Sequence, residues 1–393
     1  RDRLNNSLMD ATFVLNNYRV IYNFMPNYGG SPWHNGQMTT GPDGSQLVDF
    51  AVTFPVDDQL FGAVDFTWCN PGNPGGTSFT DKSLQSEQTS YEIFKAIGIH
   101  YNYRKYVHLF VNGSQRSRSS DRSGNLLIED GQQPNGDVVE EWYPDDTDGE
   151  LFKIEDWFEF VVNSYTFSNN DADLIRRTVV LNGQPTLVIA PYRFMWRRRA
   201  IGAGESANDY TNFFKMVDAV SPASNPTVSS FSDTRNIESI INIEQWMRSF
   251  ACQHTVGNWD SYGYRRGKND YTYKGVNGRF ELMSWDIDFT MGIGGDGTTY
   301  QLFETTDPRV TAMWNTPSIL RAYWRAFYDI CYGPLNNSYL EPIIDAKAAA
   351  MAANNINYDS SQISTIKSYI SGRRNYILSL IPPAPFAISL PNY

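Results

Sequence analysis

The stretch that decides the fold begins with GNWDSYGY at residues 257–264 and ends with SWDID at residues 284–288. Between them, YTY at 271–273 and FELM at 280–283 alternate like strands, and VNG at 276–278 supplies a turn. A loop, a hairpin and a second acidic loop are therefore expected to follow one another along the chain.

These loops carry three carboxylates and one carboxamide, those of Asp260, Asn269, Asp286 and Asp288. Any one of them alone would be typical of a turn or a helix cap. Together, a hairpin can bring them close to one another, which suits a site that binds a hard divalent cation and orients a hydroxyl group. The pattern does not decide between Asp286 and Asp288 as the metal ligand, because alternating strand positions point to the same side.

Phosphoryl transfer is one reaction that such a site can perform. It needs a carboxylate for the proton of the attacking hydroxyl, an Asp and an Asn on a metal ion, and a cation on the phosphates. Asp260, Asn269 and Asp286 occur in the chain order found in protein kinases, although the HRD and DFG tripeptides are absent. Paired carboxylates among aromatic residues would also suit a glycosidase, which stays an alternative.

A glycine-rich run, GIGGDG at residues 292–297, matches the pattern of dinucleotide-binding loops. The residues that follow it, TTYQL, do not predict a convincing helix. Since the phosphates of a dinucleotide rest on the start of that helix, a dinucleotide site is not expected here.

Composition narrows the classes of protein further. The chain has 393 residues and a formal net charge of −11, which argues against a general nucleic-acid binder. No run of 18 apolar residues is present, so no membrane span is expected. Three widely spaced cysteines suggest neither a disulfide framework nor a zinc site. The start at Arg1 and the Pro-rich end predict a piece of a longer polypeptide with further domains.

The pattern of elements predicts two lobes and a linker. Residues 1–200 are expected to form a β-rich lobe with one main helix and a long loop at residues 112–149. Residues 201–381 are expected to form a mainly helical lobe, and residues 382–393 a Pro-rich linker. The acidic loops would then open at the junction, where small ligands usually bind.

One part of the chain carries a specific similarity to a known family. It begins with NIEQWMR at residues 242–248, continues through the loop at 257–269, and ends with WDIDF at 285–289. On these motifs, the chain resembles the spore coat protein H (CotH) family of atypical kinases, with weaker similarity extending over about residues 18–380.

The resemblance implies an α+β fold of the divergent two-lobed protein-kinase-like kind, with a β-rich N-terminal lobe and a helical C-terminal lobe. It implies a protein Ser/Thr kinase that uses ATP and Mg²⁺ or Mn²⁺. The expected substrates are secreted or surface proteins with a Ser or Thr acceptor, and the expected location is extracellular or at a bacterial cell surface.

The resemblance also implies roles for particular residues. Asp260 matches the catalytic aspartate, and Asp286 or Asp288 matches the metal-binding aspartate. Asn269 is the expected second metal ligand. Two further residues are expected to belong to the nucleotide site, namely Lys153 and Glu129.

One departure from the family pattern supports a rival interpretation. The stretch VDFAVTF at residues 48–54 contains no Lys or Arg, where the family usually carries basic residues. The alternative is therefore a catalytically silent, kinase-like structural or adhesion module of a bacterial surface protein.

Overall fold

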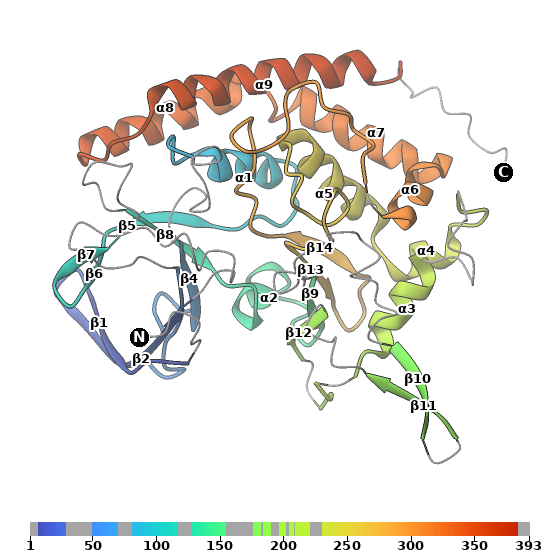
Figure 1. The fold of residues 1–393 in the computed structure, drawn as a ribbon, viewed down its shortest axis with the longest axis horizontal. Helices are drawn as coiled ribbons and strands as arrows, with labels where there is room; N and C mark the ends of the chain where they lie inside the picture. The colour runs from blue at the N-terminus through green and yellow to red at the C-terminus, as the bar shows by residue number, and fades with distance from the viewer. Residues whose placement is uncertain are drawn as a thin grey trace.

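The computed structural model describes eleven stretches of the chain, which are residues 7–28, 49–69, 81–116, 127–154, 176–181, 184–189, 196–201, 204–207, 209–220, 230–305 and 307–383. Within them the protein is a mixed α/β structure (Figure 1). Most strands come from the first half of the chain and most helices from the second half.

The larger sheet has six strands in which every neighbouring pair is antiparallel. Their spatial order is β1 (Ala11–Leu15), β2 (Arg19–Tyr28), β3 (Phe50–Thr53), β4 (Asp65–Cys69), β8 (Ile128–Gln132) and β5 (Arg104–Val107). Phe24, Phe54 and Trp68 pack together on one face of this sheet and form a separate aromatic core. Next to it lies a short hairpin of β6 (Leu109–Val111) and β7 (Ser114–Arg116).

A second sheet joins strands from both halves of the chain. Its order is β12 (Trp196–Ala200), β9 (Glu150–Ile154), β13 (Asp270–Lys274) and β14 (Glu281–Ser284). Strand β9 therefore lies in the part expected to form the first lobe but pairs directly with β13 of the second. A further hairpin consists of β10 (Arg176–Leu181) and β11 (Gln184–Ile189).

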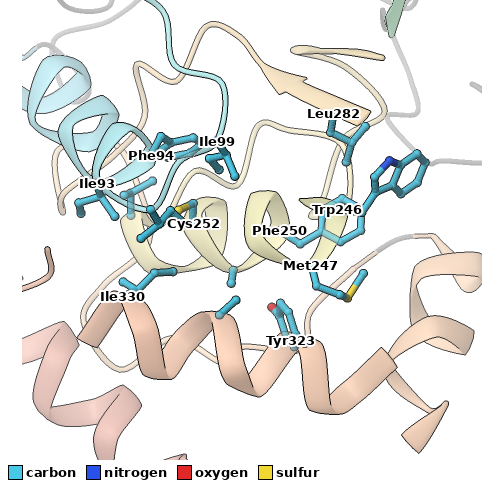
Figure 2. Close-up of a cluster of buried hydrophobic side chains, with 14 of the residues drawn as sticks. Ile93, Phe94, Ile99, Trp246, Met247, Phe250, Cys252, Leu282, Tyr323 and Ile330 are labelled. Carbon is cyan, nitrogen blue, oxygen red and sulfur yellow. The ribbon is translucent and has the colours of Figure 1, made fainter. Parts of the chain in front are cut away.

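The helices in the described residues are α1 (Ser86–Ala96), α2 (Gly136–Trp142), α3 (Thr211–Val220), α4 (Arg235–Ile240), α5 (Ile243–Val256), α6 (Pro308–Trp314), α7 (Pro317–Tyr332), α8 (Asn337–Ala353) and α9 (Ser360–Leu380). Helix α5 is central, since it contacts α1, α7 and β14. Figure 2 shows Trp246, Phe250 and Cys252 of this helix among side chains from those neighbours. This core fixes the end of α5, from which the first acidic loop starts.

Several local predictions are confirmed. The predicted hairpin is β13 and β14, paired from Asp270 opposite Ser284 to Tyr273 opposite Glu281. The motif NIEQWMR at residues 242–248 forms the start of α5, which the Asn242 side chain caps by accepting a hydrogen bond from the backbone N–H of Gln245.

The prediction of a long loop at residues 112–149 is wrong. That tract contains β7, β8 and α2, so the N-terminal part has a second helix as well. Strand β8 has the sequence IEDGQ, in which Glu, Asp and Gly are residues depleted in strands. It is a strand because β4 and β5 satisfy its backbone groups from both sides, which no local pattern reveals.

Two other expectations concern the C-terminal linker and membrane-spanning helices. Helix α9 ends at Leu380, and most of the expected linker, residues 384–393, lies outside the described residues. None of the helices in the described part of the chain combines the length and the apolar character needed to cross a membrane.

Candidate active site

The first acidic loop leaves α5 through a left-handed glycine. Gly257 has φ 77° and its N–H bonds to the carbonyl of Gln253, the usual way in which a helix ends. The loop is then tied to the hairpin by Asp270, which is fully buried. Asp270 accepts hydrogen bonds from Gln253 of α5 (3.1 Å), the backbone of Tyr262 (3.2 Å) and Ser284 of β14 (3.1 Å). One carboxylate thus fixes helix, loop and hairpin relative to one another.

Asp260 lies in this loop and is only 6% exposed. Its Oδ2 atom lies 3.1 Å from Nζ of Lys268 and accepts a hydrogen bond from Nδ2 of Asn269 at 3.2 Å. The Arg266 guanidinium is farther away, at 3.8 Å from Oδ1. Burial raises the pKa of Asp260, while the nearby positive charge of Lys268 opposes that rise.

Two of the expected metal ligands have an unusual backbone conformation. Asn269 has φ 59° and Asp286 has φ 56°, both in the left-handed region. Asn and Asp tolerate this region better than most residues, and such conformations concentrate at functional sites. The Asn269 carbonyl accepts the N–H of Trp285, so the residues that precede the hairpin and follow it are held together.

The three aspartates share one electrostatic neighbourhood. Burial raises the pKa of Asp288 well above its usual value, and the charges of Asp286, Glu87 and Asp260 raise it further. Asp286 also contributes to the raised pKa of Asp260. Charges with these effects lie near one another, so Asp260, Asp286 and Asp288 belong to one region. Asn269 belongs to it as well, through its bonds to Asp260 and to the backbone of Trp285. Asp286 is exposed and Asp288 is half-buried.

An arginine next to this region was not predicted. Arg104 of β5 donates a hydrogen bond to Glu87 of α1 at 3.0 Å, and its side chain is only 3% exposed. Its guanidinium lies 5.3 Å from the ring centre of Trp285, the residue before Asp286. Among the residues that the structure describes, the Nε and Nη1 atoms of Arg104 have no hydrogen-bond partner although they are buried, and the same holds for the hydroxyl of Tyr91. Unsatisfied buried donors of this kind often mark a place for a ligand or water.

Glu129 lies beside this arginine. It is 3% exposed, and it accepts a hydrogen bond from the Gln88 side chain of α1 at 2.7 Å. Burial alone would lower the pKa of Arg104, but Glu87, Cys69 and Glu129 together hold it well above its usual value. Glu129, expected from the resemblance, thus belongs to the surroundings of Arg104.

Lys153 has a less direct relation to the aspartates. It lies on β9, half-buried, opposite Tyr271 of β13. The Tyr271 ring packs edge-on against Trp285. The structure therefore places Lys153 on the strand next to the hairpin.

Sequence reasoning missed three charged residues, namely Glu87, Arg104 and Lys268. Lys268 directly precedes Asn269, within the loop at residues 257–269. Arg104 could have been found from the alternating NYRKYV at residues 102–107, which places a basic residue on a strand. Glu87 carried no local signal, since an acidic residue in the first turn of a helix is common.

The donor set fits a hard cation that also binds phosphate oxygens. In the part of the chain that is described, no three His, Cys, Asp or Glu side chains cluster tightly enough to hold a metal ion by themselves. Mg²⁺ sites in phosphoryl-transfer enzymes usually have only one or two carboxylates, and substrate phosphates and water complete them. Asp286 and Asp288, with Asn269 nearby, meet that requirement.

Comparison with known proteins supports the resemblance. The family model described as CotH kinase protein matches residues 192–381, which include α5, both acidic loops and the last four helices. No curated protein matched the chain. The resemblance to the CotH family of kinase-like proteins is thus confirmed over residues 192–381, which are somewhat less than half of the chain.

Proposed function

We propose that this protein is an ATP- and metal-dependent protein Ser/Thr kinase with a two-lobed, kinase-like arrangement. The observation that carries the proposal is the position of Asp260, next to Lys268 and Asn269 and in the same neighbourhood as Asp286 and Asp288. The match to the CotH kinase protein family covers all five residues. The proposed substrates are secreted or surface proteins, which places the protein outside the bacterial cell.

Asp260 is the proposed general base. Its carboxylate orients the acceptor hydroxyl of a Ser or Thr and takes its proton during transfer. A base works best when its pKa approaches the working pH, and burial raises the pKa of Asp260 in that direction. Lys268 keeps the carboxylate charged before the reaction, because its ammonium group lies 3.1 Å away.

Asp286, Asp288 and Asn269 are the proposed holders of Mg²⁺ or Mn²⁺. Nδ2 of Asn269 donates to Asp260, so its Oδ1 is the atom suited to a cation. Burial first, and then the charges of nearby carboxylates, raise the pKa of Asp288, and a divalent cation would relieve the repulsion among these carboxylates. A bound metal ion would neutralise charge on the transferred phosphoryl group.

The basic part of the site comes from a residue on β5. The two unpaired donors of Arg104 suit an anion, and Glu87 holds the guanidinium in place. Glu129 supports the same group. Lys153 is proposed as a further contact to the nucleotide phosphates, on the basis of the resemblance. Strand β3 does not supply this charge, since its residues, Phe50–Thr53, include no Lys or Arg.

A transfer assay tests the proposal. The purified protein is incubated with labelled ATP, Mn²⁺ and a generic acceptor protein, and the incorporation of label is compared with that of Asp260→Ala and Asp286→Ala. We expect both variants to lose at least about 100-fold in rate, the usual range for a lost general base or metal ligand. Equal incorporation by all three proteins would remove the assignment.

The lack of basic residues on β3 favours one second candidate, a catalytically silent surface module. A silent module predicts no change in melting temperature with millimolar ATP and Mn²⁺, because a ligand that binds only the native state must stabilise it. If the protein is a kinase, ATP and Mn²⁺ should raise its melting temperature, and Asp286→Ala should reduce this rise.

A further inference from the structure

The segment that follows Asp288 runs from residue 289 to residue 305 without a helix or a strand, yet it is closely attached to the loop that carries Asp260. The indole N–H of Trp259 donates to the carbonyl of Gly294 at 2.8 Å, and the Trp259 ring stacks on Phe289. The N–H of Asp296 bonds to the carbonyl of Gly257 at 3.0 Å. Any displacement of one segment relative to the other would therefore break these contacts.

The approach of the two backbones is close. A Cβ atom on Gly295 would lie 2.6 Å from the carbonyl oxygen of Phe289 and 2.9 Å from that of Gly257. Met291 has φ 56°, which costs free energy for a residue with a long side chain, and its N–H bonds to the carbonyl of Val256. A strained conformation persists only when its surroundings hold it. Contacts with other side chains must therefore hold this segment in its conformation.

Arg265 is the charged group at the centre of this contact. Its Nη2 atom lies 3.0 and 2.9 Å from the two carboxylate oxygens of Asp296 and 3.1 Å from Oε2 of Glu304. The guanidinium also lies 4.4 Å from the ring centre of Tyr300. The Tyr264 hydroxyl donates to the same Asp296 carboxylate. One arginine of the first loop therefore contacts three side chains of the following segment.

We infer that Arg265 is a positioning residue: it holds the segment 289–304 against the loop that carries Asp260 by pairing with the segment's own carboxylates, Asp296 and Glu304. This keeps the backbone that leaves Asp286 and Asp288 in one conformation. The consequence for phosphoryl transfer rests on the proposed function, but the effect on the segment does not.

Arg373 of α9 holds the same segment from another side. Its guanidinium donates to the carbonyls of Thr298 and Tyr300 and to that of His254 in α5. This side chain is fully buried, so its removal would endanger the whole fold. Arg265 is 24% exposed and Asp296 only 11%, which makes Arg265 the residue that can be tested without unfolding the protein.

The test is hydrogen exchange of backbone amides followed by mass spectrometry, with the complete chain. We expect Arg265→Gln to accelerate exchange in residues 289–304 by about tenfold or more, since charge-assisted hydrogen bonds are lost. Arg265→Lys keeps the charge but loses the planar fork. Its exchange rate in residues 289–304 should therefore lie between those of the wild type and of Arg265→Gln. The matched control is Arg325→Gln, which breaks an ion pair with Asp329 of the same helix, α7, and leaves the pairs of Asp296 and Glu304 intact.

Salt tests whether the ion pairs of Arg265, and not the packing of its side chain, hold the segment. Partly exposed ion pairs are screened by salt, so 1 M NaCl should accelerate exchange of the segment in the wild type and change it much less in Arg265→Gln. Unchanged exchange in Arg265→Gln, or the same acceleration in Arg325→Gln, overturns the inference.

The activity assay is read separately. If the wild type transfers phosphate, Arg265→Gln should lower kcat by about tenfold or more and Arg265→Lys should recover part of it. If the wild type transfers none, the proposed function fails, while the exchange measurement still decides the role of Arg265.

Discussion

The ammonium group of Lys268 lies 3.1 Å from Oδ2 of Asp260, and both side chains are shielded from most solvent. A buried carboxylate and a cation that precedes Asn269 by one residue thus form the centre of the candidate site. This pair makes the ionisation of Asp260 depend on Lys268, and the dependence can be measured.

Replacing Lys268 with Met should move the pH dependence of transfer. Lys268 lowers the pKa of Asp260, against the effect of burial, so its removal raises that pKa. Because the base must be ionised, the acidic limb of kcat/KM should move to higher pH in Lys268→Met. Lys274→Met is the control, since the Lys274 ammonium bonds to backbone carbonyls in the hairpin turn. A limb that stays in place or moves to lower pH contradicts the assigned pairing.

Replacing Asp260 with Asn should remove catalysis and leave the fold intact. We expect kcat to fall by about 10²- to 10⁴-fold, because Asn cannot accept the proton. The free energy of unfolding should fall moderately: Asn keeps the volume of the side chain and an oxygen that accepts from Asn269, but Lys268 loses its charged partner. Urea denaturation and initial rates measure the two effects. The control is Asp345→Asn, which alters an exposed pair with Lys367 and should change neither the rate nor the stability. A rate equal to that of the wild type in Asp260→Asn would exclude Asp260 as the base.

Replacing Arg104 with Lys should weaken nucleotide binding. Lys preserves the charge beside Glu87 but loses the planar fork and the donors that have no partner. We expect the Kd for ATP with Mn²⁺ to rise by about tenfold, the value of one charge-assisted hydrogen bond. Calorimetry measures it, with Lys105→Met on the same strand as control. An unchanged Kd would remove Arg104 from the nucleotide site.

The same calorimetry tests Lys153. If this lysine contacts the phosphates, Lys153→Met should also raise the Kd for ATP by about tenfold. The substitution retains most of the apolar length of the side chain, so packing of β9 should be preserved. A Kd equal to that of the wild type would exclude Lys153 as a contact to the nucleotide phosphates. Arg104 would then remain the proposed phosphate contact.

Replacing Gly263 with Ala should destabilise the loop that carries Asp260. Gly263 has φ 80°, and an added Cβ would lie 2.2 Å from the Phe250 ring of α5. The left-handed conformation and the clash together should cost about 2–5 kcal/mol of unfolding free energy. Gly297→Ala is the matched control, since its Cβ would meet nothing within 4 Å. Equal urea midpoints for the two variants would show that the loop adapts without cost.

Local sequence patterns predicted the elements whose stability depends on neighbours along the chain. The apolar spacing of α5, its Asn242 cap and its Gly257 end are all encoded within about fifteen residues, as is the hairpin of β13 and β14. Because those two elements flank the first acidic loop, the sequence could also predict that Asp260, Asn269 and Asp286 follow one another around one hairpin.

The tertiary structure decided what depends on distant parts of the chain. Strand β8 is a strand because β4 and β5 pair with it, and β9 joins β13 across a separation of more than a hundred residues. The same is true of charge: Glu87 of α1 meets Arg104 of β5 only in the folded chain, and Arg265 reaches Glu304 only because the later segment folds back. The acidic residues were thus evident from local spacing, whereas the cations that hold and balance them required the packed fold, since opposite charges pair through space and not through sequence.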